Sequence, residues 1–517
     1  MGSEFPFTLS DPRLGDLDCL VDGQPATAKS GKRFHVIDPG SGKSWASCPD
    51  CRQEDVEAAV QSSHRAFQSY SKWTPRQRAQ TLLKWHEEII AARDDLAKIL
   101  VYETGKPLAE AYGEIDYATT FTWWFVGEAE RVQGASIVSA IPGRRAVTIK
   151  QPIGVAAALV PWNFPIALTL RKASAALAAG CTMIVKPSPE TPITALSVAR
   201  LALKAGFPPG ALNVLTTSLE GTPELAEALC LHPLVKKVTF TGSTRVGKII
   251  SSLCARNLKK STMELGGNCP FIIFEDANLD QALGQLMALK WRHAGQACVS
   301  SNRVYVQRGI YDKFVGLVVQ ATSQLKMGHG MDEGATLGPV TTPRSLDRAE
   351  EMAKDALAKG AKLVLGTGSR DDSNSGGYFM APTILTNVTD DMLMSQDEIF
   401  APLLGLSVFD SEEEVVQRAN NTAMGLTSYA FTKNVDRLWR LFESLEAGMI
   451  GLVSKPQAAS MRNLRLIRSV QNTGNNSSAE APFGGIKESG SGKESGKGVA
   501  IEEFMVTKTG TFTIEGL

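Results

Sequence analysis

The 517-residue sequence has little that would point to a membrane, a nucleic acid or a metal ion. It contains no apolar run of the roughly 18 residues that suggest a membrane-spanning helix. Its 54 Lys and Arg residues are balanced by 54 Asp and Glu residues, so the zero net charge gives no electrostatic basis for binding nucleic acid or an anionic membrane. Its six His residues are scattered and form no metal-ligand motif. We therefore expect no metal, no nucleic-acid partner and no membrane partner.

Cysteine is also scarce, and eight residues in a chain of this length do not form a disulfide scaffold. Cys48 and Cys51 form a CxxC pair. Without a second pair or a nearby His, we expect them to be reduced thiols in a turn after a strand. The N-terminus carries acidic residues and lacks the apolar segment of a secretory signal, which favours a cytoplasmic protein. Residues 1–5 are either native or a cloning scar, and the sequence leaves both open.

Hydrophobic periodicity divides the chain into a helical segment and two stretches of alternating strands and helices. Residues 54–112 have apolar side chains at three-to-four spacing, which is typical of helices. Strand patterns and helical patterns then alternate from Gly154 to Leu258, where the last helix is expected at Thr244–Leu258. They alternate again from Pro270 to Leu452, with one helix expected near Tyr311–Met327. Such alternation predicts βαβ units and parallel sheets. Residues 366–377 are rich in Gly, Ser and Asp and are predicted to form an exposed loop.

Three short segments contain the parts of a thiol enzyme. Cys298 follows a Gly-Gln-Ala segment, Glu264 precedes two glycines, and Asn163 stands between two prolines. A Cys thiolate is a nucleophile, a carboxylate is a general base, and a side-chain amide can donate to an oxyanion. Because an isolated Cys is usually just a small core residue, the inference depends on all three segments together.

The three segments resemble those of the aldehyde dehydrogenase superfamily. The resemblance covers nearly the whole chain and includes four further stretches in the family's order: 185–188, 240–243, 398–400 and 481–485. It implies an α/β fold with two Rossmann-like parallel α/β domains and a small β oligomerisation flap. The implied parts are an NAD(P)-binding domain at 20–133 and 153–265, a catalytic domain at 266–452, a return segment lining the active site at 472–497, and the flap at 134–152 and 498–517.

The resemblance also implies a role for each catalytic residue. Cys298 attacks the aldehyde and forms a thiohemiacetal, whose oxyanion accepts hydrogen bonds from the Asn163 side chain and the Cys298 backbone N–H. Hydride transfer to a nicotinamide leaves a thioester, and Glu264 is the base for its hydrolysis.

The implied cofactor is NAD(P), although the sequence has no GxGxxG motif. Gly242 and Ser243 lie between a strand and a helix, where backbone N–H groups can bind a pyrophosphate. Lys186 matches the lysine that binds the adenosine ribose, and Pro189 stands where NAD-preferring relatives tend to have a Glu. We therefore expect NADP to be accepted, and a preference for NADP over NAD stays open. The expected cofactor-binding residues are Trp162, Lys186, Ser188, Gly242, Ser243, Glu398 and Phe400.

Two arginines indicate an acidic substrate. Arg292 lies six residues before Cys298, and Arg171 lies eight residues after Asn163. Two guanidiniums near the thiol would bind a carboxylate through charge-assisted hydrogen bonds, and Ser477 could add a hydroxyl. This set resembles that of the succinate-semialdehyde branch of the family. His293, which follows Arg292, replaces the Asn that is usual in the family, and the sequence assigns it no role.

One segment departs from the family pattern. The family would run from Gly448–Leu452 directly into residues 472–474, but 19 residues, Val453–Gln471, stand between them. The segment carries basic residues and no acidic ones. Its ends can be encoded by splice-donor and splice-acceptor sequences, and its length keeps the reading frame, so we interpret it as a retained intron. A genuine surface insertion is the alternative, because long loops cost little entropy.

The predicted function is the NAD(P)-dependent oxidation of succinate semialdehyde to succinate, as in GABA degradation. Two alternatives stay open. The chain could be an aldehyde dehydrogenase for another carboxylated or small aldehyde, or an inactive homologue disabled by the 453–471 insertion. The resemblance also implies a homodimer or homotetramer.

Overall fold

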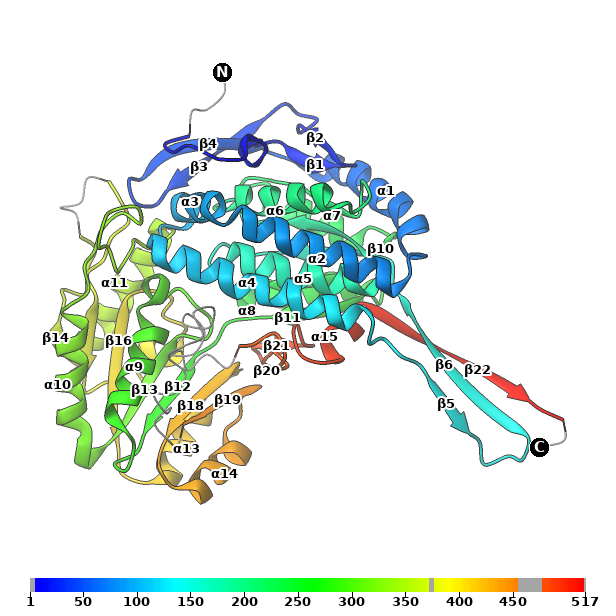
Figure 1. The fold of residues 1–517 in the computed structure, drawn as a ribbon. Coiled ribbons are helices and arrows are strands. Elements are labelled where there is room, and N and C mark those ends of the chain that lie inside the picture. Colours follow the sequence, from blue (N-terminus) through cyan, green and yellow to red (C-terminus); the bar gives the residue numbers. More distant parts are fainter. Residues whose placement is uncertain (1–4, 372–375, 454–476, 516–517) are drawn as a thin grey trace.

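The computed structural model describes residues 5–371, 376–453 and 477–515, which form two lobes and a projecting ribbon of strands (Figure 1). Each lobe is built around one large sheet. Within the described residues, no helix is long and apolar enough to cross a membrane.

The first sheet has the strand order β2-β1-β9-β8-β7-β10-β11-β21. Its strands are β1 (Cys19–Val21), β2 (Gln24–Ala26), β7 (Val155–Leu159), β8 (Thr182–Lys186), β9 (Leu212–Val214), β10 (Val235–Thr241), β11 (Lys260–Glu264) and β21 (Gly490–Ser491). The strands from β9 to β11 pair in parallel, whereas β1 and β21 join them antiparallel at the two sides. β7 and β8 are buried along their whole length, as expected for a parallel sheet covered on both faces.

The helices of this lobe cover both faces of the sheet. They are α1 (Gln53–Tyr70), α2 (Pro75–Ala91), α3 (Arg93–Thr104), α4 (Leu108–Ala129), α5 (Pro165–Ala179), α6 (Pro192–Ala205), α7 (Thr222–Leu231) and α8 (Thr244–Ala255). Because side chains alternate along a strand, Ala156 and Ala158 of β7 pack in the core that α2–α6 share, whereas Val155 and Ala157 pack with α1, α7 and α8. The N-terminal segment adds a short helix, η1 (Pro12–Gly15), and the hairpin β3 (Arg33–Asp38)–β4 (Lys43–Pro49).

The second sheet has the order β14-β15-β16-β13-β12-β18-β19 and is parallel except between β14 and β15. Its strands are β12 (Cys269–Ile273), β13 (Ser301–Gln307), β14 (Lys362–Leu365), β15 (Thr383–Thr386), β16 (Leu403–Phe409), β18 (Thr427–Phe431) and β19 (Met449–Val453). The helices of this lobe are α9 (Leu279–Lys290), η2 (Arg292–Gly295), η3 (Arg308–Ile310), α10 (Tyr311–Thr322), α11 (Pro343–Ala358), α12 (Leu393–Gln396), α13 (Glu412–Asn420) and α14 (Val435–Ser444).

The C-terminal part of the chain returns from the second lobe to the first. β17 (Met424–Gly425) pairs with β20 (Ile486–Lys487), and β21 then joins the edge of the first sheet beside Glu264. After α15 (Val499–Glu502), β22 (Met505–Thr513) forms an antiparallel sheet with β6 (Arg144–Pro152) and β5 (Ala135–Val138). Figure 1 shows this three-stranded ribbon projecting away from both lobes, and it exposes the apolar side chains of Ile137, Val138 and Phe512.

The predicted α/β class with parallel sheets is confirmed, and the differences lie at element ends. The helical region 54–112 is divided by Thr74, which caps α2 through Gln77, and by Gly105, which ends α3 at a φ of 80°. The helix expected to reach Leu258 ends at Ala255, and in the turn that follows Leu258 has a left-handed φ of 50°. The helix expected near Tyr311–Met327 ends at Thr322.

Some predictions fall wholly or partly outside the described residues. Of the 453–471 insertion only Val453, the last residue of β19, is described, and residues 372–375 of the predicted loop are not. The domain boundaries given above stay predictions. Of the CxxC pair, Cys48 lies within β4 rather than in a turn, and both thiols are free and buried.

Candidate active site

The chain reaches Cys298 through a strained turn. His293, Ala294 and Gly295 have φ values of 50°, 51° and 79°, and such values are uncommon for residues other than glycine. Hydrogen bonds to His293 hold this backbone in place. Its N–H donates to Glu110 Oε2 at 2.8 Å, and its carbonyl oxygen accepts from Gln296 N at 3.0 Å and Gln296 Nε2 at 2.9 Å. The turn therefore fixes the position of the candidate nucleophile.

A glycine lets the loop after β11 pass against the nucleophile's backbone. A Cβ added at Gly267 would collide with the carbonyl oxygen of Cys298. The Cys269 thiol donates a hydrogen bond to the same oxygen at 3.3 Å. The glycine at position 267 therefore allows a close approach between its loop and the backbone of the Cys298 segment.

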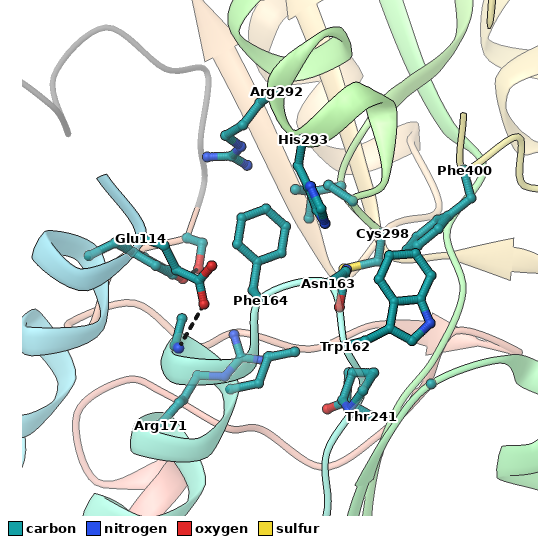
Figure 2. A pocket seen from close by; sticks show the side chains of 18 of the residues that line it. Glu114, Trp162, Asn163, Phe164, Arg171, Thr241, Arg292, His293, Cys298 and Phe400 are labelled. Atoms are coloured by element: carbon teal, nitrogen blue, oxygen red, sulfur yellow. Dashed lines mark hydrogen bonds between the residues drawn. The ribbon is translucent and has the colours of Figure 1, made fainter. Parts of the chain in front are cut away.

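Cys298 lines a cavity of about 420 Å³ whose walls come from both lobes (Figure 2). Most of the predicted site residues line this cavity: Trp162, Asn163, Arg171, Gly242, Ser243, Arg292, Cys298, Glu398, Phe400 and Ser477. Three other predicted site residues, Glu264, Lys186 and Ser188, are not part of its wall. The fold therefore brings ten of the thirteen predicted residues to one cavity.

The thiol of Cys298 is half-buried, and its surroundings favour the protonated form. Burial raises its pKa to about 12, and the nearby Glu398 carboxylate acts in the same direction, whereas Arg171 opposes the shift. Attack on an aldehyde therefore requires loss of the thiol proton.

Asn163 is held beside Cys298 by a buried network. Its Nδ2 donates to the carbonyl oxygen of Gln296 at 3.1 Å, and its own carbonyl oxygen accepts from Lys106 Nζ at 3.0 Å. Lys106 also pairs with Glu114, whose carboxylate accepts the N–H groups of Ile166 and Ala167 at the start of α5. An amide nitrogen carries two hydrogens, and the bond to Gln296 uses one of them.

Glu264 is the last residue of β11 and is not among the residues that line the cavity. Its side chain is 2% exposed, and both carboxylate oxygens lack a hydrogen-bond partner among the described residues. Burial raises its pKa well above the usual range, and the Glu494 carboxylate adds to the shift. A buried carboxylate without partners costs free energy, and such groups concentrate where chemistry needs them.

The residues expected to bind the cofactor form two groups. Trp162, Glu398 and Phe400 surround the Cys298 end of the cavity, where the Trp162 and Phe400 rings meet edge to face at 5.5 Å. Glu398 accepts the Gly267 N–H at 3.2 Å, and burial raises its pKa to about 7. Ser243 caps α8 by accepting the Val246 N–H, so the helix N-terminus faces the cavity beside Gly242.

The second group lies at the end of β8, away from the cavity wall. Lys186 is buried, and this burial lowers its pKa to about 8. Within the described residues it forms no ion pair. Ser188 Oγ donates to Glu190 at 2.5 Å, and Glu190 also pairs with Arg344 of α11 at 3.3 Å. The carboxylate nearest to Lys186 along the chain is therefore already bound by two other groups.

The two arginines of the predicted substrate site differ in their surroundings. Arg171 is buried, pairs with Glu494, and stacks 4.1 Å above the Phe483 ring. Arg292 lies 5.2 Å from the centre of the Phe164 ring, and its Nε has no hydrogen-bond partner among the described residues. Arg292 is consequently the cation that is freer to bind an acidic substrate.

Several residues of the site were not predicted from the sequence. Tyr117 lines the cavity and hydrogen-bonds to Ser477, and Glu494 binds both Arg171 and Lys172. Glu110, Glu114 and Tyr117 share one face of α4 at spacings of four and three residues. Two carboxylates on the inner face of a largely apolar helix are a signal that could have marked this face as functional.

Together, the fold and the cavity define a thiol enzyme built on two parallel α/β lobes, with an arginine facing the nucleophile's cavity. The aldehyde dehydrogenase family pattern matches residues 26–510. The chain belongs to the aldehyde dehydrogenase family.

Individual relatives match over nearly the full chain. "Succinate-semialdehyde dehydrogenase [NADP(+)] 1" of Schizosaccharomyces pombe is 41% identical and covers 99% of both chains. The mitochondrial succinate-semialdehyde dehydrogenase of Mus musculus is 44% identical over 95% of this chain and 89% of its own. The 3-sulfolactaldehyde dehydrogenase of Pseudomonas putida is 42% identical over 97% and 98%. The crystal structure of an E. coli NADP-dependent enzyme superposes with a TM-score of 0.92 at 41% identity, covering 98% of this chain and 100% of that one.

Proposed function

We propose that this protein oxidises succinate semialdehyde to succinate, with NADP or NAD as the hydride acceptor. The observation that carries the proposal is the arrangement of Arg292 and Cys298 on one cavity, with Arg292 Nε unpaired among the described residues. A cation without a carboxylate partner in a half-buried site favours an anionic ligand. The similarity to succinate-semialdehyde dehydrogenases supports the same substrate.

The chain's own residues account for the chemical steps. The Cys298 thiol releases its proton to water and Sγ attacks the aldehyde carbon. The oxygen that becomes negative accepts hydrogen bonds from Asn163 Nδ2 and the Cys298 backbone N–H. When a nicotinamide is bound, it supplies the hydride acceptor. Glu264 then removes a proton from the water that cleaves the Cys298 thioester, which releases the acid and the thiol. Arg292 and Ser477 hold the far carboxylate during these steps.

The described residues fit a nicotinamide dinucleotide. Gly266 leaves room in front of Glu398, because a Cβ there would lie 3.0 Å from Glu398 Oε2. Glu398 would bind the nicotinamide ribose, and Gly242 and Ser243 would bind the pyrophosphate at the start of α8. Lys186, without an ion pair in the described part of the chain, would bind the adenosine ribose or its 2′-phosphate. Since no carboxylate stands at Pro189, NADP should be accepted.

The test is to incubate the purified full chain with succinate semialdehyde and either NADP or NAD, and to follow reduced cofactor at 340 nm. Succinate should form in a one-to-one ratio with reduced cofactor. Cys298→Ala should abolish this activity while retaining cofactor binding, measured by quenching of tryptophan fluorescence. Substantial turnover by Cys298→Ala, or no turnover by the natural chain, would contradict the proposal.

A second candidate substrate is a short aldehyde with another acidic group. A sulfonate carries the same charge as a carboxylate and would be bound by the same guanidinium, and a relative of 42% identity is a 3-sulfolactaldehyde dehydrogenase. Comparing kcat/KM for succinate semialdehyde and 3-sulfolactaldehyde in one preparation decides between them. A chain disabled by the 453–471 segment would oxidise neither.

We also propose a cytoplasmic homodimer or homotetramer assembled through the ribbon of β5, β6 and β22. Support comes from the apolar side chains that this ribbon exposes, which a second subunit would cover. Sedimentation of the purified chain would test the oligomeric state, and a monomer would contradict it.

A further inference from the structure

His293 lines the same cavity as Cys298 but takes no part in the steps described above. Its side chain and backbone together are 1% exposed. It also stands where the family usually has Asn. A buried imidazole in the wall of an active site should have a hydrogen-bond partner for each of its polar atoms.

Each polar atom of His293 is bound except one. The backbone N–H is bound by Glu110, and the carbonyl oxygen by Gln296. The ring Nδ1 lies 3.5 Å from Gln296 Nε2, whose amide hydrogens make it a donor, so Nδ1 is the acceptor. In a neutral ring Nε2 then carries the hydrogen. Nε2 is buried and has no partner among the described residues.

The ring lies between the two ends of the cavity. His293 meets the Trp162 ring edge to face at 6.1 Å and the Phe164 ring at 5.8 Å, whereas Arg292 lies over Phe164. Figure 2 shows the His293 ring directed toward Cys298, and the Arg292 guanidinium directed away from it. The unpaired N–H is therefore close to the reacting end of a substrate whose acidic end is bound by Arg292.

We propose that His293 Nε2–H binds a hydroxyl oxygen on the substrate carbon next to the aldehyde carbon. The preferred substrates are then short acidic aldehydes with an α-hydroxyl group, such as 3-hydroxy-4-oxobutanoate. This inference depends on the proposed function, in which Arg292 binds the acidic end of the substrate. It adds a contact to the hydroxyl group on the carbon next to the aldehyde. The oxidation itself is unchanged, because the hydroxyl group is bound and not transformed.

Two physical arguments support a neutral hydrogen-bond donor at this position. Burial holds the pKa of His293 well below its usual range, and Lys106 and Arg292 act in the same direction, so the ring stays uncharged. A buried N–H without a partner costs free energy, which a ligand oxygen recovers and a methylene group does not. The site should therefore discriminate between the hydroxylated aldehyde and its unsubstituted analogue.

The experiment compares kcat/KM for 3-hydroxy-4-oxobutanoate and for succinate semialdehyde. In His293→Phe, which keeps a ring but removes the N–H, the ratio of the two values should fall about tenfold or more. His293→Gln should restore much of the ratio, because its side-chain amide can place an N–H near the position of Nε2. His86→Phe is the matched control. It makes the same substitution at a half-buried histidine that is not part of the cavity wall, and the ratio should stay near that of the natural chain.

A second measurement separates this inference from the proposed function. Titration calorimetry with malate and succinate, the corresponding products, measures binding without turnover. His293→Phe should weaken malate binding more than succinate binding, again by about tenfold. Equal losses for both acids, or an unchanged kcat/KM ratio, would overturn the role of His293 even if succinate semialdehyde is oxidised. Failure to oxidise either aldehyde would contradict the proposed function, and the difference in acid binding would still decide the role of His293.

Discussion

Arg171 donates a hydrogen bond from Nε to one carboxylate oxygen of Glu494 at 3.0 Å, and its Nη2 lies 2.8 Å from the same oxygen in an ion pair. Both side chains are almost fully buried, and Glu494 also binds Lys172. The charge of Arg171 is therefore largely balanced within the protein, unlike that of Arg292. The two arginines that the sequence makes equivalent should consequently respond differently to mutation.

Arg292→Ala should raise KM for succinate semialdehyde strongly. Losing the partner of a desolvated carboxylate costs roughly 2–5 kcal/mol, which is about 30-fold or more. The kcat/KM for butanal, which has no carboxylate, should change far less. Arg171→Ala should lower kcat/KM for both aldehydes, because it leaves Glu494 without one of its buried partners. Equal losses for the two aldehydes in Arg292→Ala would show that Arg292 does not bind the carboxylate.

Glu264→Gln should stall the reaction after one turnover. A burst of reduced cofactor should remain, because only thioester hydrolysis needs the base. Rapid mixing at 340 nm measures the burst and the steady-state rate separately. A steady-state rate equal to that of the natural chain would exclude Glu264 as the base.

The same variant should gain stability relative to the natural chain as pH rises. Because burial and Glu494 raise the folded-state pKa of Glu264, its ionisation is opposed in the folded state. The contribution of Glu264 to the free energy of unfolding is thus fully present below the pKa of Glu264 in the unfolded chain. It is lost as pH rises through the pKa of Glu264 in the folded protein. The difference in Tm between Glu264→Gln and the natural chain should increase from pH 5 to pH 9. Glu57→Gln is the control and should not show this increase. Glu57 is exposed, and hydrogen bonds from Gln61 and His232 lower its pKa.

Gly267→Ala should impair catalysis more than folding of the lobes. The new Cβ would collide with the Cys298 carbonyl oxygen, and this would displace the nucleophile. Small displacements of a reacting group can cost about 100-fold in rate. Gly284→Ala in α9 is the control, since its Cβ would meet no atom within 4 Å. If kcat is similar in the two variants, the close contact at Gly267 does not position Cys298.

Pro189→Glu should shift the cofactor preference from NADP toward NAD. A carboxylate at this position would accept hydrogen bonds from the ribose hydroxyls and repel a 2′-phosphate, and such repulsion costs several kcal/mol. Because Glu190 is bound by Ser188 and Arg344, it does not already provide that carboxylate. The measurement is the NADP/NAD ratio of kcat/KM, and an unaltered ratio would mean that the ribose binds elsewhere.

Deleting Val453–Gln471 should raise both activity and stability. The deletion would bring the end of β19 near Leu452 close in sequence to Ser477, which hydrogen-bonds to Tyr117 in the cavity wall. Tm and kcat/KM of the two chains measure the effect. Sequencing of the transcript is an independent check, since a spliced message should join the codons of Leu452 and Asn472. A misfolded or less active deletion variant, with only the unspliced message present, would identify the segment as a real part of the protein.

The sequence by itself determined the parts of this protein that depend on local patterns. The alternation of strand and helix patterns predicted the parallel sheets. Apolar side chains repeat every two residues in a half-buried strand and about every 3.6 residues in a helix, so both patterns can be read from the sequence. The segments around Cys298, Glu264 and Asn163 identified the family because each carries its residues within a few positions. The ends of elements were less predictable, as in α8, which ends at Ala255, three residues before the left-handed Leu258.

Only the tertiary structure decided which charges and donors of the site are free. Glu494 lies 323 residues from Arg171, and Tyr117 lies 360 residues from Ser477, so no local pattern connects either pair. The unpaired Nε2 of His293 likewise depends on where Gln296, Glu110 and two aromatic rings meet it. Ion pairing, burial and hydrogen-bond satisfaction depend on distances in space, and in a chain of this length these are set by packing between segments far apart in the sequence.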